Sequence, residues 1–281
     1  MRSPVKYNKP YRTKHSMNQK LPDAPLDLSS SGSHAEGEID LTIVIPCLNE
    51  VENIVGTLDN VYSRLKDQPF IYEIIVVDDI SEDDTFAVAS AWAQAHAGLV
   101  PIKVIKRALH RRGYGAVVRY GTAYGSGRYC IFVSADNVDP VHLIPQLYQE
   151  MENGAIMAQC SRYLRAGDDS TIPFSYKFYQ FFFRIGVRIA VGQNIPDSTY
   201  AFKMFRRREL LGVGLSSNRF NISPEITFKS ILIGDRVAYV PGAQGVRQGG
   251  KSKFIFHKEG LGYGYCLLRA FFHRHKIIYW F

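Results

Sequence analysis

The chain has 281 residues, 46% hydrophobic and 21% charged, which are ordinary values for a globular protein with one large or two small domains. Its formal charge of +8 is distributed unevenly along the sequence. From Arg247 to residue 281 there are seven Lys/Arg and one acidic residue, Glu259. A basic aromatic segment of this kind favours an acidic ligand or an anionic membrane surface, and we expect no nucleic-acid partner because no nucleic-acid motif accompanies it.

Residues 1–38 are polar and show few periodic apolar positions, which predicts a disordered leader outside the fold. The leader carries positive charge but no apolar core, so we do not interpret it as a secretory signal. No run approaches the roughly 18 uninterrupted apolar residues of a membrane span. The longest candidate, 174–192, is interrupted by Lys177, Arg184 and Arg188.

From Leu41 onward, apolar strand-like runs alternate with helical patterns. The predicted strands are 41–47, 71–77, 102–105, 129–134 and 156–160. Cysteines lie within apolar runs at 47, 130 and 160, which predicts buried thiols and a reducing compartment. The alternation predicts an α/β fold with a mostly parallel central sheet covered by helices, and ligands at the carboxyl ends of the strands.

The helices begin at recognisable signals. Asn49 and Glu52 form a capping signal before the first helix, and Asp139 before a proline is expected to cap a later one. Gly113 and Gly115 open a glycine-rich helix start. Its amides could meet a phosphate, although a tight turn accounts for both glycines.

Polar side chains follow the first two strands. Pro46 lies near the end of the first, Asn49 and Glu50 follow it, and helix capping accounts for Asn49 but not for Glu50. Asp78 and Asp79 end the second, where a carboxylate can accept hydrogen bonds from ribose hydroxyls. We expect one of the two to cap the following turn and favour Asp79 as the nucleotide ligand.

Residues 134–139, Ser-Ala-Asp-Asn-Val-Asp, form the candidate metal site. A departing nucleoside diphosphate gains negative charge, which Mg²⁺ or Mn²⁺ neutralises when one or two carboxylates hold it. Asp136 is the expected ligand, beside Ser134. Basic residues complete the pattern. Arg162 follows the fifth strand, and Arg247 and Lys253 flank a glycine pair in a loop that could close over a diphosphate.

Together, 41–50, 73–79, 134–136 and 247–253 resemble family 2 glycosyltransferases, and most of all the polyprenyl-phosphate branch typified by dolichyl-phosphate mannose synthase. The resemblance implies a GT-A type nucleotide-diphospho-sugar transferase domain at 39–245. A phosphate-binding lid and a basic aromatic membrane-surface tail would follow at 246–281. It assigns the nucleotide sugar to Pro46, Asn49, Glu50, Asp78, Asp79, Ser134, Asp136, Arg162, Arg247 and Lys253. Catalysis falls to Asp136, Arg247 and Lys253, and the metal to Asp136.

The chain departs from the family pattern at several positions. Ser134 replaces the first Asp of the D-x-D motif and Val138 a polar second ligand, so the metal has fewer protein ligands than usual. In the segment 197–202, which mirrors D-x-T-S-G-F, Tyr200 and Ala201 are departures. For 246–281, the alternative to a surface anchor is a last helix packed on the core, with Trp280 buried and its cations in water.

The acceptor side rests on 174–192 and two carboxylates. This helix carries phenylalanines and isoleucines on one side, with Lys177, Arg184 and Arg188 interspersed. It is either a core helix with solvated cations or a membrane-facing helix that gathers an acceptor phosphate. Asp197 and Glu225 stand where the resemblance puts acceptor-side carboxylates, although helix capping or a buried ion pair with Arg247 explains either. A phosphate acceptor needs no general base, so both would then position the site.

The expected function is inverting transfer of a sugar from a nucleoside diphosphate sugar to a polyprenyl phosphate, by a peripheral enzyme on the cytoplasmic face of a membrane. The alternatives are a family 2 enzyme acting on a saccharide hydroxyl, or a non-catalytic nucleotide- or membrane-binding scaffold. The expected partners are the donor, the lipid phosphate and the membrane surface. The resemblance leaves open a small membrane partner subunit.

Overall fold

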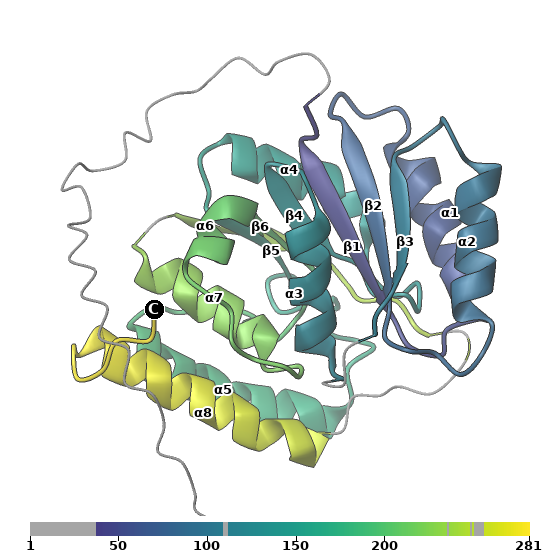
Figure 1. Cartoon of the computed structure of the whole chain (residues 1–281). Helices are drawn as coiled ribbons and strands as arrows, with labels where there is room; N and C mark the ends of the chain where they lie inside the picture. Colours follow the sequence, from purple (N-terminus) through teal and green to yellow (C-terminus); the bar gives the residue numbers. More distant parts are fainter. Residues whose placement is uncertain (1–37, 109–111, 235, 248, 250–255) are drawn as a thin grey trace, which may run out of the picture. The chain divides into compact units, whose positions relative to one another are not determined.

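The computed structural model describes residues 38–281 except 109–111, 235, 248 and 250–255. The predicted leader, 1–38, thus lies outside the described residues but for its last position. A seven-stranded sheet in the order β3-β2-β1-β4-β6-β5-β7 occupies the centre (Figure 1). Its strands are β1 Leu41–Cys47, β2 Tyr72–Asp78, β3 Ile102–Lys106, β4 Tyr129–Phe132, β5 Met157–Ser161, β6 Lys203–Arg206 and β7 Val237–Pro241.

Six strands run in one direction and β6 runs against them, pairing antiparallel with β4 and β5. Strand β1 shows why this sheet is buried. Leu41, Ile43 and Ile45 belong to the core on one face, whereas Val44 belongs to the core on the other. A strand with apolar side chains on both faces is stable only between two helical layers. The predicted mostly parallel, helix-covered sheet is confirmed.

Helices form three groups around the sheet (Figure 1). One face packs against α1 Ile54–Leu65, α2 Thr85–Ala95, the short 3-10 helix η1 Val141–Leu143 and α4 Ile144–Glu152. The other face packs against α3 Tyr114–Tyr124, α6 Arg207–Gly212 and α7 Ile222–Leu232. Beyond α7, α5 Phe174–Val191 and α8 Phe256–Arg274 lie side by side.

Strands β6 and β7 were not predicted from the sequence. In β6 the first residue, Lys203, is fully buried, contrary to the usual place of a lysine. Its Nζ donates to the carbonyl of Ser223 at 3.0 Å and to Thr227 Oγ1 at 2.8 Å. Burial lowers the pKa of Lys203 to about 7. Because its amine is hydrogen-bonded, Lys203 can be buried in β6, in the middle of the sheet.

The capping role predicted for Asn49 is wrong. Asn49 has a left-handed φ of 52°, and α1 begins only after Asn53. The Asn49 side chain instead accepts from the Glu82 backbone N–H at 2.8 Å, and its own N–H donates to Ser81 Oγ at 2.9 Å. These contacts join the loop after β1 to the loop after β2, so a tertiary contact replaces the local cap.

Helix α8 combines the two alternatives weighed for 246–281. Its Tyr263, Cys266 and Ala270 are buried against α5 and α7, and Trp280 is buried with them. Its other side exposes Leu261, Tyr265 and Leu268, with exposed fractions of at least 57%. The helix thus belongs to the packed fold while presenting apolar side chains outward. The phosphate-binding lid and the membrane-surface anchor predicted for 246–281 both stay predictions.

Candidate active site

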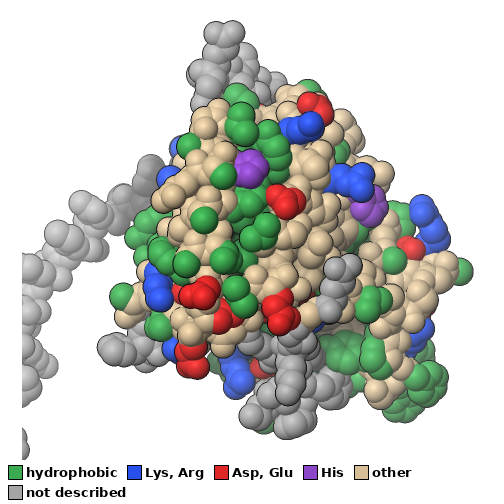
Figure 2. Space-filling view, turned by 90° about the vertical axis from the view of Figure 1, so that its right-hand side faces the viewer, with side chains coloured by type: hydrophobic (Ala, Val, Ile, Leu, Met, Phe, Trp, Pro, Cys, Tyr) green, Lys and Arg blue, Asp and Glu red, His purple; other side chains and the backbone are tan. Residues whose placement is uncertain are grey.

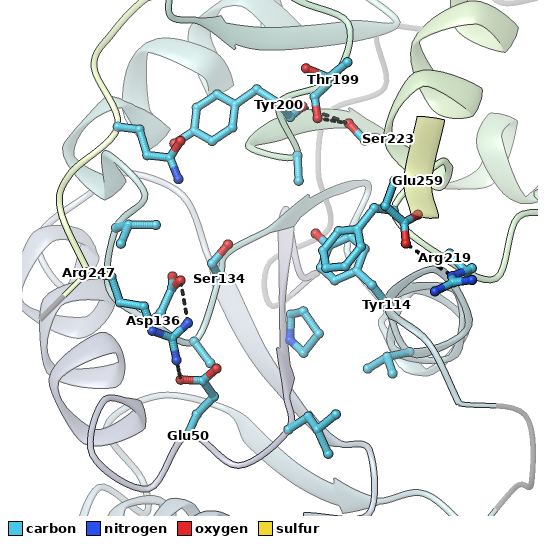
Figure 3. Close-up of a pocket in the computed structure, with 18 of the residues that line it drawn as sticks. Glu50, Tyr114, Ser134, Asp136, Thr199, Tyr200, Arg219, Ser223, Arg247 and Glu259 are labelled. Atoms are coloured by element: carbon cyan, nitrogen blue, oxygen red, sulfur yellow. Dashed lines mark hydrogen bonds and ion pairs between the residues drawn. The ribbon is translucent and has the colours of Figure 1, made fainter. Parts of the chain in front are cut away.

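A cavity of about 950 Å³ opens at the carboxyl ends of the parallel strands (Figure 3). Pro46 near the end of β1, Asp79 after β2, Ser134 after β4 and Arg162 after β5 all line it. Ligands bind at this edge of parallel α/β sheets. Four strand ends thus meet at one site, while the ligands assigned to their residues stay predictions.

At one end of the cavity, Arg247 joins two carboxylates (Figure 3). Its Nη1 donates to Asp136 Oδ2 at 3.0 Å, and its Nη2 donates to Glu50 Oε2 at 2.5 Å. Glu50 is held in turn by the Asn53 amide, which donates to Oε2 at 3.0 Å. All three charged side chains are at most 20% exposed, which strengthens their attraction. We call Glu50, Asp136 and Arg247 the Arg247 cluster.

One carboxylate oxygen of Asp136 is suited to a metal ion. Oδ1 is buried and has no hydrogen-bond partner among the described residues. Burial raises the pKa of Asp136, Arg247 lowers it and Glu50 raises it, with a net increase. The described part of the chain holds no group of three His, Cys, Asp or Glu that could bind a metal alone. The site therefore fits Mg²⁺ or Mn²⁺ only if phosphate oxygens and water complete the coordination.

One of the two acids at the end of β2 stabilises the following turn, as predicted. Asp78 does not line the cavity, and its Oδ2 accepts from the Ser81 backbone N–H at 3.1 Å, which stabilises the turn. Asp79 lines the cavity. Its Oδ1 pairs with Arg107 at 2.6 Å, and its Oδ2 accepts from the Gly113 N–H at 3.1 Å. Nucleotide binding by either residue stays a prediction.

Gly113 and Gly115 allow their backbone to lie close to the backbone of 217–219. A Cβ on Gly113 would lie 2.4 Å from the Asn218 carbonyl oxygen, and one on Gly115 would lie 2.4 Å from that of Ser217. Gly113 also has φ of +134°, which other residues rarely adopt. Packing against the 217–219 backbone therefore requires these glycines.

Arg162 and Asp197 form a buried pair in the cavity wall. Arg162 Nε donates to Asp197 Oδ2 at 2.8 Å, and its Nη1 donates to Gln244 Oε1 at 3.1 Å. Burial lowers the pKa of Arg162, but the Asp197 carboxylate raises it to well above its ordinary value. Asp197 is fully buried and does not line the cavity. It positions Arg162, and its predicted role on the acceptor side stays a prediction.

The capping role predicted for Asp139 is wrong. Its Oδ2 accepts from the Ser134 N–H at 2.6 Å, and its Oδ1 accepts from the Tyr200 hydroxyl at 2.8 Å. The 3-10 helix that follows has no side-chain cap. Asp139 thus fastens the loop of Asp136 to the loop of Tyr200, one of the two departures from the family pattern at 197–202. Burial raises the pKa of Asp139 to about 6.

Glu225 lies outside the cavity wall, contrary to its predicted place beside an acceptor. It is fully buried in α7, where it pairs with Lys229 at 3.0 Å and accepts from the Ser216 and Ser217 N–H groups at 2.9 and 2.7 Å. The alternative of an ion pair with Arg247 is also wrong, because Arg247 contacts Glu50 and Asp136. Glu225 instead fixes the loop that precedes α7.

The cations of α5 do not line the cavity either. Lys177 pairs with Asp169 at 2.9 Å, Arg184 lies over the Tyr163 ring, and Arg188 is exposed. Along the same helix runs a row of large apolar side chains, each 46–82% exposed: Phe174, Phe178, Phe181, Phe182, Ile185 and Ile189. We call this row the α5 apolar face. The face over α1 and α2, by contrast, intersperses acidic, basic and apolar side chains (Figure 2).

The other end of the cavity was missed by the sequence analysis. Arg219 Nε pairs there with Glu259 Oε1 at 3.2 Å, close to Tyr114 (Figure 3). Tyr176 of α5 and Tyr263 of α8 also line the cavity. Lys253, predicted to act from the lid, lies outside the described residues, as does most of the 247–253 loop.

Comparison with known proteins identifies the family. The model of glycosyl transferase family 2 matches residues 42–211. The chain belongs to glycosyl transferase family 2. It is 33% identical over 217 residues to a dolichol-phosphate mannosyltransferase of Pyrococcus furiosus, covering 76% of this chain and 58% of that relative. It is 27% identical over 216 residues to an undecaprenyl-phosphate mannosyltransferase of Micrococcus luteus, covering 75% of this chain and 85% of that protein.

Solved structures support the fold. Glucosyl-3-phosphoglycerate synthase of Mycobacterium tuberculosis, in complex with Mn²⁺, UDP and glucosyl-3-phosphoglycerate, superposes with a TM-score of 0.58 at 18% identity. The match covers 84% of this chain and 80% of that one. The GT-A architecture and the resemblance to the polyprenyl-phosphate branch are confirmed. Among the helices of the described residues, none combines the length and apolarity of a membrane span.

Proposed function

We propose that this protein transfers one sugar from a nucleoside diphosphate sugar to a polyprenyl phosphate at the cytoplasmic face of a membrane, with inversion at the anomeric carbon. The observation that carries this proposal is the continuity of one cavity. It extends from the Arg247 cluster to Tyr176 on α5 and Tyr263 on α8, and α5 carries an apolar face outward. Two relatives named for transfer to dolichol phosphate and undecaprenyl phosphate support the choice of acceptor.

The donor binds at the Arg247 cluster in this proposal. Pro46, Glu50 and Asp79 line the part of the wall assigned to the nucleoside. Mg²⁺ or Mn²⁺ at Asp136, together with diphosphate oxygens, supplies charge neutralisation for the leaving group. Arg247 already stands 3.0 Å from Asp136, close enough to share the diphosphate. Lys253 supplies a further cation when the 247–253 loop closes.

The acceptor approaches from the side of α5 and α8. A lipid phosphate is anionic near neutral pH and attacks without a general base. Asp197 and Glu225 are committed to Arg162 and to the loop before α7, which agrees with a reaction that needs neither as a base. The α5 apolar face rests at the membrane interface, where Lys177, Arg184 and Arg188 suit the headgroup level. Attack from the face opposite the diphosphate inverts the anomeric configuration.

A panel of radiolabelled nucleoside diphosphate sugars, incubated with the protein, Mg²⁺ and liposomes containing polyprenyl phosphate, tests this proposal. We expect label from one donor to enter the organic phase, and chelation of the metal to stop it. Label that enters only a water-soluble saccharide would favour the hydroxyl-acceptor enzyme. No turnover with any donor would favour a non-catalytic scaffold.

A further inference from the structure

The ion pair between Arg219 and Glu259 is unequal. The Glu259 side chain is 4% exposed, whereas that of Arg219 is 60% exposed. Both residues line the cavity, on the side opposite the Arg247 cluster (Figure 3). A buried carboxylate thus holds an arginine whose side chain is still largely accessible.

The other arginines of the described cavity wall either donate hydrogen bonds to several protein groups or lie beside the loop after β2. Arg162 donates from all three nitrogens to Asp197, Thr199 and Gln244. Arg247 donates to Asp136, Glu50 and the Gly249 carbonyl. Arg112 donates to the Ile80 carbonyl at 3.3 Å, beside the loop after β2. Arg219 is therefore the cavity arginine on the α8 side with a guanidinium still open to a ligand.

The backbone that carries Arg219 is firmly held. Glu225 accepts from the N–H groups of Ser216 and Ser217. Arg119 donates to Asn218 Oδ1 at 2.6 Å, and the Ala116 N–H donates to the Asn218 carbonyl at 3.2 Å. A side chain on such a base has a defined position before any ligand arrives, which lowers the entropic cost of binding.

The surroundings of Arg219 suit a phosphate on an apolar chain. Tyr114, stacked on Phe220 with ring centroids 4.9 Å apart, lines the wall with Tyr176 and Tyr263. These aromatic side chains offer apolar surface to the chain that carries the phosphate. The guanidinium fork matches phosphate oxygens in a bidentate way. Tyr176 lies in the first turn of α5, whose positive dipole end also favours an anion.

We infer that Arg219 binds the phosphate of the acceptor, and that Glu259 holds Arg219 in the cavity until the acceptor replaces it as the partner of the guanidinium. The inference rests on the proposed function and specifies its acceptor site. It also separates the chain from a hydroxyl-acceptor enzyme, in which Glu259 would be a cavity carboxylate on the acceptor side placed to act as a general base.

The test compares Arg219→Ala with Arg236→Ala, a matched control. Arg236 forms an exposed ion pair with Glu150 and does not line the cavity. Binding of water-soluble farnesyl phosphate is measured by calorimetry, with inorganic phosphate as a second probe, and KM values for donor and lipid phosphate are measured alongside. We expect Arg219→Ala to weaken farnesyl phosphate binding and raise the acceptor KM roughly 10–100-fold. The donor KM should stay within about twofold, and Arg236→Ala should match wild type.

The possible failures are distinguishable. If wild type binds farnesyl phosphate and Arg219→Ala binds it equally, the inference is overturned while the proposed function stands. If wild type neither binds nor uses a lipid phosphate, both are overturned. Glu259→Gln adds an independent readout, since we expect kcat within a few-fold of wild type and an equal or lower acceptor KM. A fall in kcat of roughly 10²–10⁴-fold would identify Glu259 as a general base and overturn its role as a holder.

Discussion

The two ends of the cavity differ in the net charge of their ion pairs. At the Arg247 cluster, two carboxylates share one guanidinium, which leaves a net charge of −1 among largely buried groups. At the other end, the charges of Arg219 and Glu259 balance each other, and most of the Arg219 side chain remains accessible. Surplus negative charge favours a divalent cation, which can then bind a diphosphate. A balanced pair with an accessible arginine favours exchange of one anion for another. This difference supports the proposal that the donor and the acceptor bind at opposite ends of the cavity.

The largest effect should come from removing the negative charge of the donor end. Asp136→Asn keeps the shape of the side chain but loses the carboxylate whose buried Oδ1 has no hydrogen-bond partner among the described residues. We expect the transfer rate to fall by at least about 10³-fold at every metal concentration, because charge neutralisation of a leaving group is worth several kcal/mol. Rates across a Mg²⁺ and Mn²⁺ titration measure this.

Asp169→Asn is the matched control for Asp136→Asn. Asp169 also pairs with a basic residue, Lys177, but lies outside the cavity wall. The transfer rate of Asp169→Asn should stay near that of wild type. Both variants should be folded, as shown by cooperative thermal unfolding. Near-normal transfer by Asp136→Asn would mean that a metal, if used, binds elsewhere.

A second variant, Glu225→Gln, distinguishes an effect on stability from an effect on the transfer rate. Glu225→Gln removes the charge partner of fully buried Lys229, so we expect the free energy of unfolding to fall by about 3 kcal/mol. The rate per folded molecule should change less than about tenfold, because the carboxylate lies outside the cavity wall. Denaturant unfolding and initial rates measure the two effects. A rate loss of roughly 10²-fold or more with unchanged donor binding would favour a hydroxyl acceptor.

We expect the membrane to be contacted by the acceptor side of the molecule and not by the rest of its surface. Phe178 and Phe182 belong to the α5 apolar face and are 61% and 55% exposed. Replacing both by Glu should weaken binding to anionic liposomes roughly 10–100-fold, because each buried phenylalanine contributes about 1.5–3 kcal/mol at most. Leu99→Glu, at a residue 62% exposed in the connection before β3, is the control. Equal co-sedimentation of both variants with wild type would exclude this face as the contact.

A smaller effect concerns Asp139, which joins the loop of Asp136 to the loop of Tyr200. Burial raises its pKa to about 6, so the folded protein holds this proton more tightly than the unfolded chain. This group therefore makes the free energy of unfolding fall as pH rises from about 4 to 6. Urea unfolding of wild type and Asp139→Asn at several pH values measures the contribution. The variant should lack this component of the pH slope, and identical slopes would contradict the assignment.

Sequence reasoning succeeded where the chemistry lies next to a strong periodic pattern. The long apolar runs predicted β1 and β2, and with them the place of Glu50 and Asp79 at the sheet edge. The contact of Arg247 with Asp136, 111 residues apart, could be anticipated only because both segments resemble one family. Periodicity alone contains no information on such a separation.

The failures share a physical cause. The sequence around Asn49 and Asp139 is typical of helix caps. Their side chains instead form tertiary hydrogen bonds with Glu82 and Tyr200, which replace the local caps. Arg219 and Glu259 carry no motif at all. Their pairing depends on how α8 packs beside the loop before α7, which is a tertiary property. Isolated charged residues of this kind are read from a sequence as solvated surface.

One comparison of acceptors tests the division of the cavity most directly. Wild-type protein is given its donor and liposomes that contain either a polyprenyl phosphate or the prenol of the same chain length with a free hydroxyl. The chain and its membrane environment are identical, so the pair isolates the anionic head group that Arg219 is proposed to bind. The account predicts transfer to the phosphate and none to the prenol. Equal transfer to both would contradict it.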